Sequence, residues 1–277
     1  MEIKLKENER IDDLEYNGLK IIQKNDGFCF GMDSVILSSF VRVNKKCAIV
    51  ADFGTGTGII SILLAAKNDN IDKIYGFEIQ GEMAEMAQRS VKMNNQNDKI
   101  EIVNEDIVGL SKKNWNKKFD VIVSNPPYKK VNTGLVNQED KKLISRHEVK
   151  CTLEDLAREV SKCLKDNGSF YMVHRPERLV DICSVMRDNK LEPKEIRLVY
   201  PHATEEANLV LVRCVKCGKP CIKVLNPLVV YDENGKYTDE IYQIYGKIEG
   251  KKENFCWYGG KIVYCCDTYW ESWGYNV

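Results

Sequence analysis

The chain has 277 residues, of which 43% are hydrophobic and 30% charged, so it is long enough to bury a substantial core. Its 41 basic residues equal its 41 acidic residues, which excludes overall charge as an argument for a nucleic-acid partner. A charged amino terminus, short aliphatic runs and an odd number of cysteines, eleven, argue against secretion, a membrane span and a disulfide framework. We therefore expect a cytoplasmic protein, and we expect it to be a monomer.

Short apolar runs of strand length alternate with helical patterns along most of the chain. This alternation predicts an α/β fold, in which a mostly parallel sheet with an antiparallel edge carries helices on both faces. Such sheets bind ligands beyond the carboxyl ends of their strands. The expected strands are 48–53, 73–77, 100–103, 119–123, 169–173 and 207–215, and the expected helices are 59–66, 80–94, 153–164 and 176–189.

The chain is expected to contain one catalytic domain, because no repeat or low-complexity linker divides residues 20–245. We assign 1–19 to an amino-terminal leader, 20–246 to the domain and 247–277 to an extension rich in aromatic residues and cysteines, for which the sequence indicates no function. A separate cluster, Cys214, Cys217 and Cys221, lacks an adjacent fourth ligand, so we expect no metal there.

A glycine-rich turn follows the first of these strands, in the sequence Asp52-Phe53-Gly54-Thr55-Gly56-Thr57-Gly58. Glycine allows positive φ and leaves room for a ligand to approach the backbone. The spacing is D-x-G-x-G-x-G, whereas a dinucleotide fingerprint reads G-x-G-x-x-G. The turn resembles motif I of the class I S-adenosylmethionine-dependent methyltransferases, in which it passes beneath the methionine and ribose of the cofactor.

Two acids follow later strands and fit the same pattern. Glu78 comes twenty residues after Gly58, where it could accept hydrogen bonds from both ribose hydroxyls, although an NAD enzyme would place an acid there too. The resemblance implies that Asp106 accepts from the adenine amino group, and it adds three neighbours to the cofactor site: Ile79, the amide of Ile107, and Phe30 in the 27–37 segment, which would close over the methionine end.

The strand 119–123 leads into Ser124-Asn125-Pro126-Pro127-Tyr128, which matches the (N/D)-P-P-Y motif of enzymes that methylate conjugated amino groups. The lone pair of such an amine is delocalised, so two acceptors must hold its N–H bonds and favour a tetrahedral nitrogen. The side-chain oxygen of Asn125 and the carbonyl of Pro126 can accept these bonds, while the prolines stiffen the turn. Tyr128 can stack on a purine. We therefore assign catalysis to Asn125, Pro126 and Tyr128.

Several further segments extend the resemblance from about Leu14 to Tyr245. They include DGFCFGMDSVIL, DFGTGTGIISILLA, FEIQ, SNPPYKK and NPLVVYDENGKYTDEIYQIY. Together they resemble the bacterial tRNA1(Val) adenine N6-methyltransferase family, which implies methylation of adenine-37, just 3′ of the anticodon, with tRNA as partner. Methylation of a release-factor glutamine or of another RNA remains the alternative, because the tetrapeptide chemistry is shared.

Basic residues are concentrated between positions 111 and 150. This segment contains ten basic residues and four acidic ones, a local excess of six. A solvated surface would have the same composition. The resemblance favours phosphate contacts around an extruded base, although Arg175 and Arg178 fit structural ion pairs equally well. The expected RNA-binding residues are Lys129, Lys130, Arg146, Arg175 and Arg178.

Overall fold

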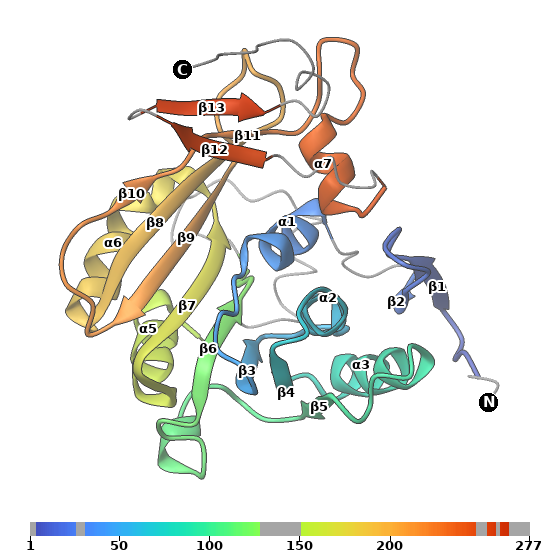
Figure 1. Cartoon of the computed structure of the whole chain (residues 1–277). Coiled ribbons are helices and arrows are strands. Elements are labelled where there is room, and N and C mark those ends of the chain that lie inside the picture. The colour runs from blue at the N-terminus through green and yellow to red at the C-terminus, as the bar shows by residue number, and fades with distance from the viewer. Residues whose placement is uncertain (1–3, 26–30, 128–150, 248–253, 259–260, 266–277) are drawn as a thin grey trace, which may run out of the picture.

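The computed structural model describes residues 4–25, 31–127, 151–247, 254–258 and 261–265, the last two ranges by their backbone alone. Nine strands of this part form one twisted sheet in the order β10-β8-β9-β7-β6-β3-β4-β5, with β11 paired to β8 (Figure 1). All neighbours are parallel except β9, which is antiparallel to both β7 and β8. The strands are β3 (Ala48–Phe53), β4 (Ile71–Phe77), β5 (Ile100–Val103), β6 (Phe119–Ser124), β7 (Leu164–His174), β8 (Leu191–Tyr200), β9 (Leu209–Lys216), β10 (Lys223–Val224) and β11 (Leu228–Val229).

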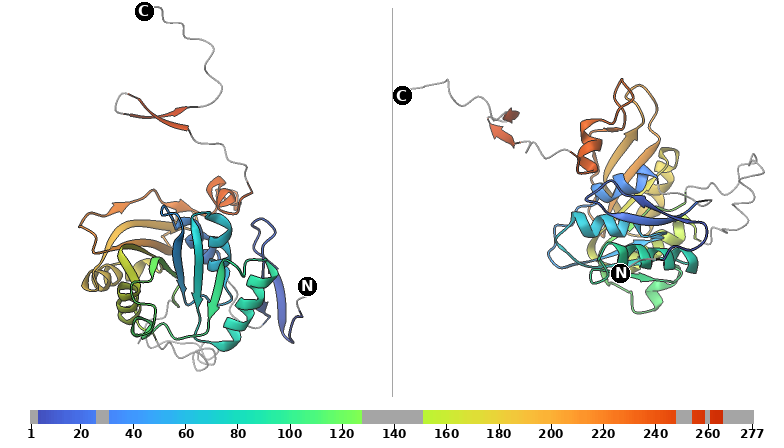
Figure 2. Two further views of the ribbon diagram at one scale, coloured as in Figure 1. Left: turned by 60° about the horizontal axis from the view of Figure 1, so that its bottom comes forward. Right: turned by 90° about the vertical axis from the view of Figure 1, so that its right-hand side faces the viewer.

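Helices cover both faces of the sheet, because strand side chains alternate between two hydrophobic clusters. In β3, Val50 packs in one cluster, while Ala51 and Phe53 pack in the other. The first cluster receives α1, α2, α3 and α7, and the second receives α5 and α6, an arrangement that Figure 2 (left) shows from another side. The helices are α1 (Met32–Phe40), α2 (Ile59–Lys67), α3 (Gly81–Met93), α5 (Leu153–Cys163), α6 (Leu179–Asp188) and α7 (Asp239–Ile244), with 3-10 turns at Leu110–Lys112 and Pro176–Arg178.

The predicted fold class is confirmed. All six expected strands are present, and the reversed strand β9 lies near one edge of the sheet, with β8 and its short partners beyond it. Sequence patterns missed β8, in which charged residues and Pro193 interrupt the apolar run. Glu195 of this strand is only 8% exposed and forms ion pairs with Arg42 and Arg213, so a buried charge occupies a position where an apolar residue would mark a strand.

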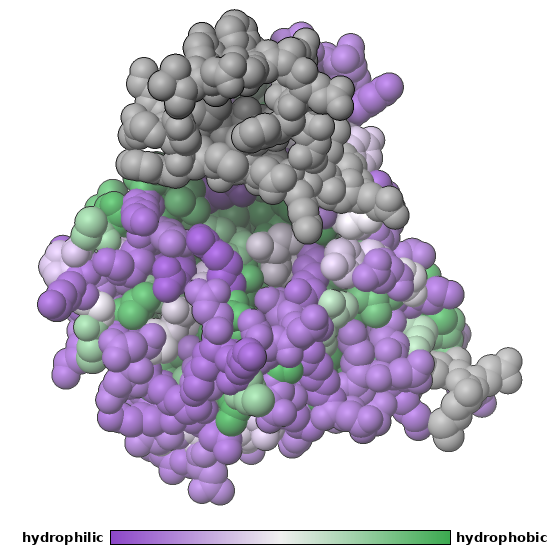
Figure 3. Space-filling view, in the orientation of Figure 1, coloured by the Kyte–Doolittle hydropathy of each residue, from purple (hydrophilic) through white to green (hydrophobic). Residues whose placement is uncertain are grey.

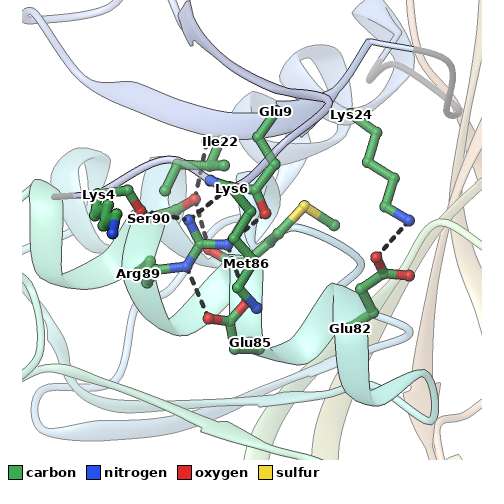
Figure 4. A network of polar contacts seen from close by, with 10 residues as sticks. All are labelled: Lys4, Lys6, Glu9, Ile22, Lys24, Glu82, Glu85, Met86, Arg89 and Ser90. Atoms are coloured by element: carbon green, nitrogen blue, oxygen red, sulfur yellow. Dashed lines mark hydrogen bonds and ion pairs between the residues drawn. The ribbon is translucent and has the colours of Figure 1, made fainter.

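An amino-terminal hairpin of β1 (Glu9–Asp13) and β2 (Lys20–Lys24) packs on α3. Figure 4 shows Arg89 at the centre of this contact, where it binds Glu9 at 2.5 Å and Glu85 at 2.9 Å. The hydroxyl of Ser90 accepts the backbone N–H of Ile22 at 3.0 Å. The hairpin precedes α1 in the chain. Its contact with α3 therefore anchors the chain just before the 27–37 segment that is expected to close over the cofactor.

The carboxyl-terminal residues that are described, β12 (Asn254–Tyr258) and β13 (Lys261–Cys265), form an antiparallel hairpin. The division into leader, domain and extension stays a prediction. No helix in the described part is long and apolar enough to cross a membrane. On the face shown in Figure 3 the coloured part of the surface is mainly hydrophilic, with apolar residues among the polar ones.

Candidate active site

Four parallel strands end side by side at the edge where the candidate site lies. The last residues of β3, β4 and β6 are paired in register, Phe53 with Phe77 and Phe53 with Ser124, and β5 follows with Val103 opposite Phe77. The hydroxyl of Ser124 also donates to the carbonyl of Phe53 at 2.8 Å. This register places the glycine turn, the two acids and Asn125, which follow these four strands, along one edge.

The glycine turn has the backbone that its sequence predicts. Gly54, Gly56 and Gly58 have φ values of 76°, 58° and 94°, a region in which side chains are strained. The amides of Gly54 and Thr55 both donate to the carbonyl of Phe77, at 3.0 and 2.9 Å, which ties the turn to β4. A Cβ atom at Gly54 or Gly56 would meet nothing within 4 Å, so open space lies above the turn, as a bound cofactor requires.

Asp52 lies beneath the turn and is fully buried. Its Oδ2 accepts hydrogen bonds from Thr55 Oγ1 at 2.7 Å and Ser61 Oγ at 2.9 Å. Burial raises the pKa of this carboxyl to about 6, against the opposing effect of the two hydroxyls. Within the described part of the chain Oδ1 has no hydrogen-bond partner, so a donor from a bound ligand or an ordered water would satisfy it.

Glu78 follows β4 and is 6% exposed. Its carboxylate accepts the amide of Gly56 at 3.0 Å and the amide of Gln80 at 2.9 Å, so it bridges the glycine turn and the start of α3. A carboxylate oxygen can accept more than one hydrogen bond, and Glu78 therefore keeps capacity for the hydroxyls of a ribose. The structure places Glu78 beside the glycine turn, and its contact with a ribose stays a prediction.

The next strand end supplies the expected neighbours of the adenine. Asn104 donates to the carbonyls of Glu78 and Ile79, at 2.7 and 3.2 Å, which joins the loops after β4 and β5. Ile79 is 46% exposed although apolar, and Asp106 accepts the amide of Val108 at 2.9 Å. Ile107 packs at the rim of the second hydrophobic cluster. An exposed apolar side chain near an acid suits a flat heterocycle with an amino group.

Asn125 lies directly beyond β6 and is partly exposed. Its Nδ2 donates to Asp33 Oδ2 at 3.1 Å and to Ser34 Oγ at 3.0 Å, both in the first turn of α1. Sequence reasoning expected the 27–37 segment to close over the cofactor and assigned no role to Asp33 or Ser34. The available signal was a pair of polar residues at the start of an otherwise apolar helix, MDSVILSSF.

Five of the expected site residues have no described position. Phe30, Tyr128, Lys129, Lys130 and Arg146 lie outside the described residues. Pro126 follows Asn125 and is partly exposed.

Arg175 and Arg178 follow β7, the strand that pairs with β6, and both have partners within the protein. Arg175 donates to the carbonyl of Asn208 at 3.0 Å, and Arg178 pairs with Asp181 at 2.6 Å. These contacts leave a role in RNA binding as a prediction.

The cysteine cluster is spread over two environments. Cys214 is buried in β9, whereas Cys217 and Cys221 are exposed in the following turn. No group of three or more His, Cys, Asp or Glu side chains within the described ranges could hold a metal ion.

Comparison with known proteins identifies the family. Residues 32–187, more than half of the chain, match the family model described as methyltransferase small domain. A tRNA1(Val) (adenine(37)-N6)-methyltransferase of Bacteroides fragilis is 29% identical over 217 residues, which cover 76% of this chain and 90% of that protein. A protein of the same name from Porphyromonas gingivalis is 30% identical over 184 residues, which cover 65% of this chain and 68% of that protein.

The fold is likewise that of solved methyltransferases. A predicted O-methyltransferase from Agrobacterium tumefaciens superposes with a TM-score of 0.63 at 21% identity, covering 78% of this chain and 96% of that one. S-adenosylmethionine is the cofactor of this protein, and the open glycine turn, the buried acid beneath it and Glu78 fit that cofactor. The chain belongs to the methyltransferase small domain family.

Proposed function

We propose that this protein transfers the methyl group of S-adenosylmethionine to N6 of adenine-37 in tRNA1(Val). The orientation of Asn125 carries the proposal, because its amide nitrogen is held by Asp33 and Ser34 and its oxygen therefore lies at the opposite end of the carboxamide. That oxygen is the acceptor that a conjugated amine needs. The relatives named as tRNA1(Val) adenine-37 methyltransferases support the choice of substrate.

In this proposal Asn125 and Pro126 orient the amine. Asn125 Oδ1 and the Pro126 carbonyl accept its two N–H bonds, which favours a tetrahedral nitrogen with its lone pair directed at the methyl group. The Ser124–Phe53 hydrogen bond at 2.8 Å holds this strand end against the strand that carries the glycine turn. Bound S-adenosylmethionine supplies an electrophilic methyl group. Catalysis then depends on alignment of reacting atoms about 3 to 3.5 Å apart.

The chain needs no strong general base in this scheme, because an alkylated amino nitrogen becomes acidic and loses its proton to solvent. Tyr128 stacks on the extruded adenine, a contact worth roughly 1–3 kcal/mol. Lys129, Lys130 and Arg146 meet the neighbouring phosphates. An adenine in a single-stranded loop can be unstacked at modest cost, which suits an anticodon loop better than a duplex.

Nucleoside analysis of tRNA after incubation with enzyme and S-adenosylmethionine tests the proposal. We expect N6-methyladenosine in tRNA1(Val) and none in the same tRNA with guanosine at position 37. Asn125→Ala should lower kcat by roughly 10²–10³-fold, the loss typical of removing one preorganised hydrogen-bonding group, while the Kd for S-adenosylmethionine stays near that of the wild type. Unimpaired turnover by this variant would refute the orienting role.

Parallel reactions examine the alternative substrates. Release factor and ribosomal RNA are incubated under the same conditions, with labelled S-adenosylmethionine. Methyl transfer to release-factor glutamine without transfer to tRNA would overturn the proposed substrate, while leaving the role of Asn125 intact because an amide nitrogen is conjugated too.

A further inference from the structure

The carboxamide of Asn125 is held by a helix that precedes it by some ninety residues in the chain. Asp33 Oδ2 lies 3.1 Å from Asn125 Nδ2, and Ser34 Oγ lies 3.0 Å from the same nitrogen. Ser34 is 5% exposed, and the helix is anchored by fully buried Val35 and Leu37. The contact therefore joins a rigid element to the residue after β6.

The chemistry of these two partners decides which way the amide faces. The two ends of a carboxamide have nearly the same shape, so packing alone does not distinguish its oxygen from its nitrogen. An ionised carboxylate is only an acceptor, whereas the serine hydroxyl can donate or accept. Asp33 therefore requires the NH2 end of Asn125 on its side, and Ser34 can adapt to that choice.

The position of Asp33 is itself constrained on both sides. Its Oδ1 accepts the backbone amide of Ser34 at 2.9 Å. A Cβ atom at Gly31 would lie 2.7 Å from the same Oδ1, so a larger residue there would displace the carboxylate. The backbone of Gly31, with φ −98° and ψ 169°, is open to any residue. Glycine at 31 therefore leaves room for the carboxylate in its observed position, whereas the backbone of the turn does not demand it.

We propose that Asp33 is a positioning residue that fixes the orientation of the Asn125 amide and so presents Oδ1 to the amino group that is methylated. This inference rests on the proposed function, because it assigns the acceptor role to Asn125. It assigns no contact with cofactor or substrate to Asp33. Its consequence is a hydrogen-bond polarity, acceptor at 33 and donor at 125, that can be reversed by exchanging the two residue types.

A swap of the two side chains tests this polarity. In Asp33→Asn the amide at 33 no longer requires the NH2 end of Asn125, and kcat should fall roughly 10- to 100-fold, the value of a hydrogen bond to a charged group. In Asn125→Asp two carboxylates face each other, and kcat should fall at least as far. The double variant D33N/N125D restores a donor–acceptor pair with an oxygen on the substrate side, so kcat should recover to within about tenfold of wild type.

Three measurements separate this role from others. The Kd for S-adenosylmethionine should stay unchanged in Asp33→Asn, and an increase in Kd with normal kcat would assign Asp33 to the cofactor and overturn the proposal. A double variant no more active than the single ones would also overturn it. Gly31→Ala, which keeps both side chains but displaces the carboxylate, should also lower kcat. Glu154→Gln, which removes a charge from the exposed first turn of α5, is the matched control and should change nothing.

An activity-independent readout keeps the inference distinct from the choice of substrate. The side-chain NH2 signals of Asn125, assigned by their absence in Asn125→Asp, should shift in Asp33→Asn and stay in place in Glu154→Gln. Unchanged signals in Asp33→Asn would refute the contact. If tRNA is not methylated but these signals shift, the proposed substrate fails while the positioning role stands.

Discussion

At the scale of single residues, Asp52 makes stability depend on pH. Burial raises its pKa from 3.8 to about 6, so the native state binds a proton more tightly than the unfolded chain does. The resulting stabilisation is fully present below pH 3.8 and is lost as the pH rises through 6. In the Asp52→Asn variant the carboxyl group is gone, so this loss of stability with rising pH does not occur. The free energy of unfolding of the variant, relative to wild type, should therefore rise by up to roughly 3 kcal/mol between pH 4 and pH 7.

Urea unfolding without S-adenosylmethionine at a series of pH values measures this difference. Asp72→Asn is the matched control, because Asp72 is an exposed aspartate in β4. Its curve should run parallel to that of wild type. Parallel curves for Asp52→Asn as well would show that Asp52 has an ordinary pKa in the folded protein.

Cys221 has a backbone conformation that cysteine rarely adopts. Its φ is +124°, far outside the ordinary range of residues with a Cβ, and Cys217 in the same turn has φ +56°. Cys221→Gly should remove the strain and raise the free energy of unfolding by roughly 1–2 kcal/mol, with a smaller gain for Cys217→Gly. Thermal unfolding checks this. Cys221→Ala keeps the Cβ and removes the thiol, so it should give no gain, and an equal gain would assign the effect to the thiol.

At the scale of elements, the amino-terminal hairpin depends on α3. Arg89 of α3 pairs with Glu9 of the hairpin, whose side chain is only 3% exposed. Arg89→Met keeps the aliphatic part of the side chain but leaves Glu9 buried without its cation. We expect the free energy of local unfolding of the hairpin to fall by roughly 1–3 kcal/mol, with no change in the rest of the protein. Hydrogen exchange should accelerate at residues 9–24, including the Ile22 amide, and stay unchanged in β6 and β7.

Arg187→Met provides the comparison, because Arg187 pairs with Glu192 and has 60% of its side chain exposed. Such an exposed ion pair contributes little to the free energy of unfolding, so hydrogen exchange in the amino-terminal hairpin should match that of wild type. Equal acceleration across the whole sheet in Arg89→Met would contradict a local role and indicate that the hairpin and the sheet unfold together.

Strand patterns predicted the elements that build the site, because β3 and β6 are mainly apolar and the motifs follow them directly. The patterns missed β8, where Glu195 is buried by pairing with arginines from elsewhere. They also could not connect Asp33 to Asn125, which are 92 residues apart. Local periodicity reports burial along one element, whereas these contacts depend on how distant elements pack.

At the scale of the whole molecule, the basic residues of 111–150 lie on both sides of β6 in the sequence. Lys117 and Lys118 directly precede this strand, whereas Lys129 and Lys130 come after it, outside the described residues. The amides of Lys117 and Lys118 donate to the carbonyls of Lys162 and Cys163, just before β7 begins, so these two lysines lie near the amino-terminal edge of the parallel strands. The six residues of β6 span about 20 Å at roughly 3.3 Å per residue, which separates that edge from Asn125. Sequence composition treated all these lysines as one patch, whereas the contacts of Lys117 and Lys118 place these two away from the edge at which β6 ends.

This division predicts which lysines bind the tRNA near the target base. Lys129→Glu combined with Lys130→Glu should raise the KM for tRNA more than tenfold and lower the slope of log Kd against log salt by roughly 1.4, the value for two contacts to single-stranded phosphates. Lys117→Glu combined with Lys118→Glu makes the same change in charge at the amino-terminal edge and should leave both quantities near wild type. Equal losses in the two double variants would mean that tRNA binding depends on overall charge, or that the tRNA spans both edges, and would refute a phosphate site confined to the edge that carries Asn125.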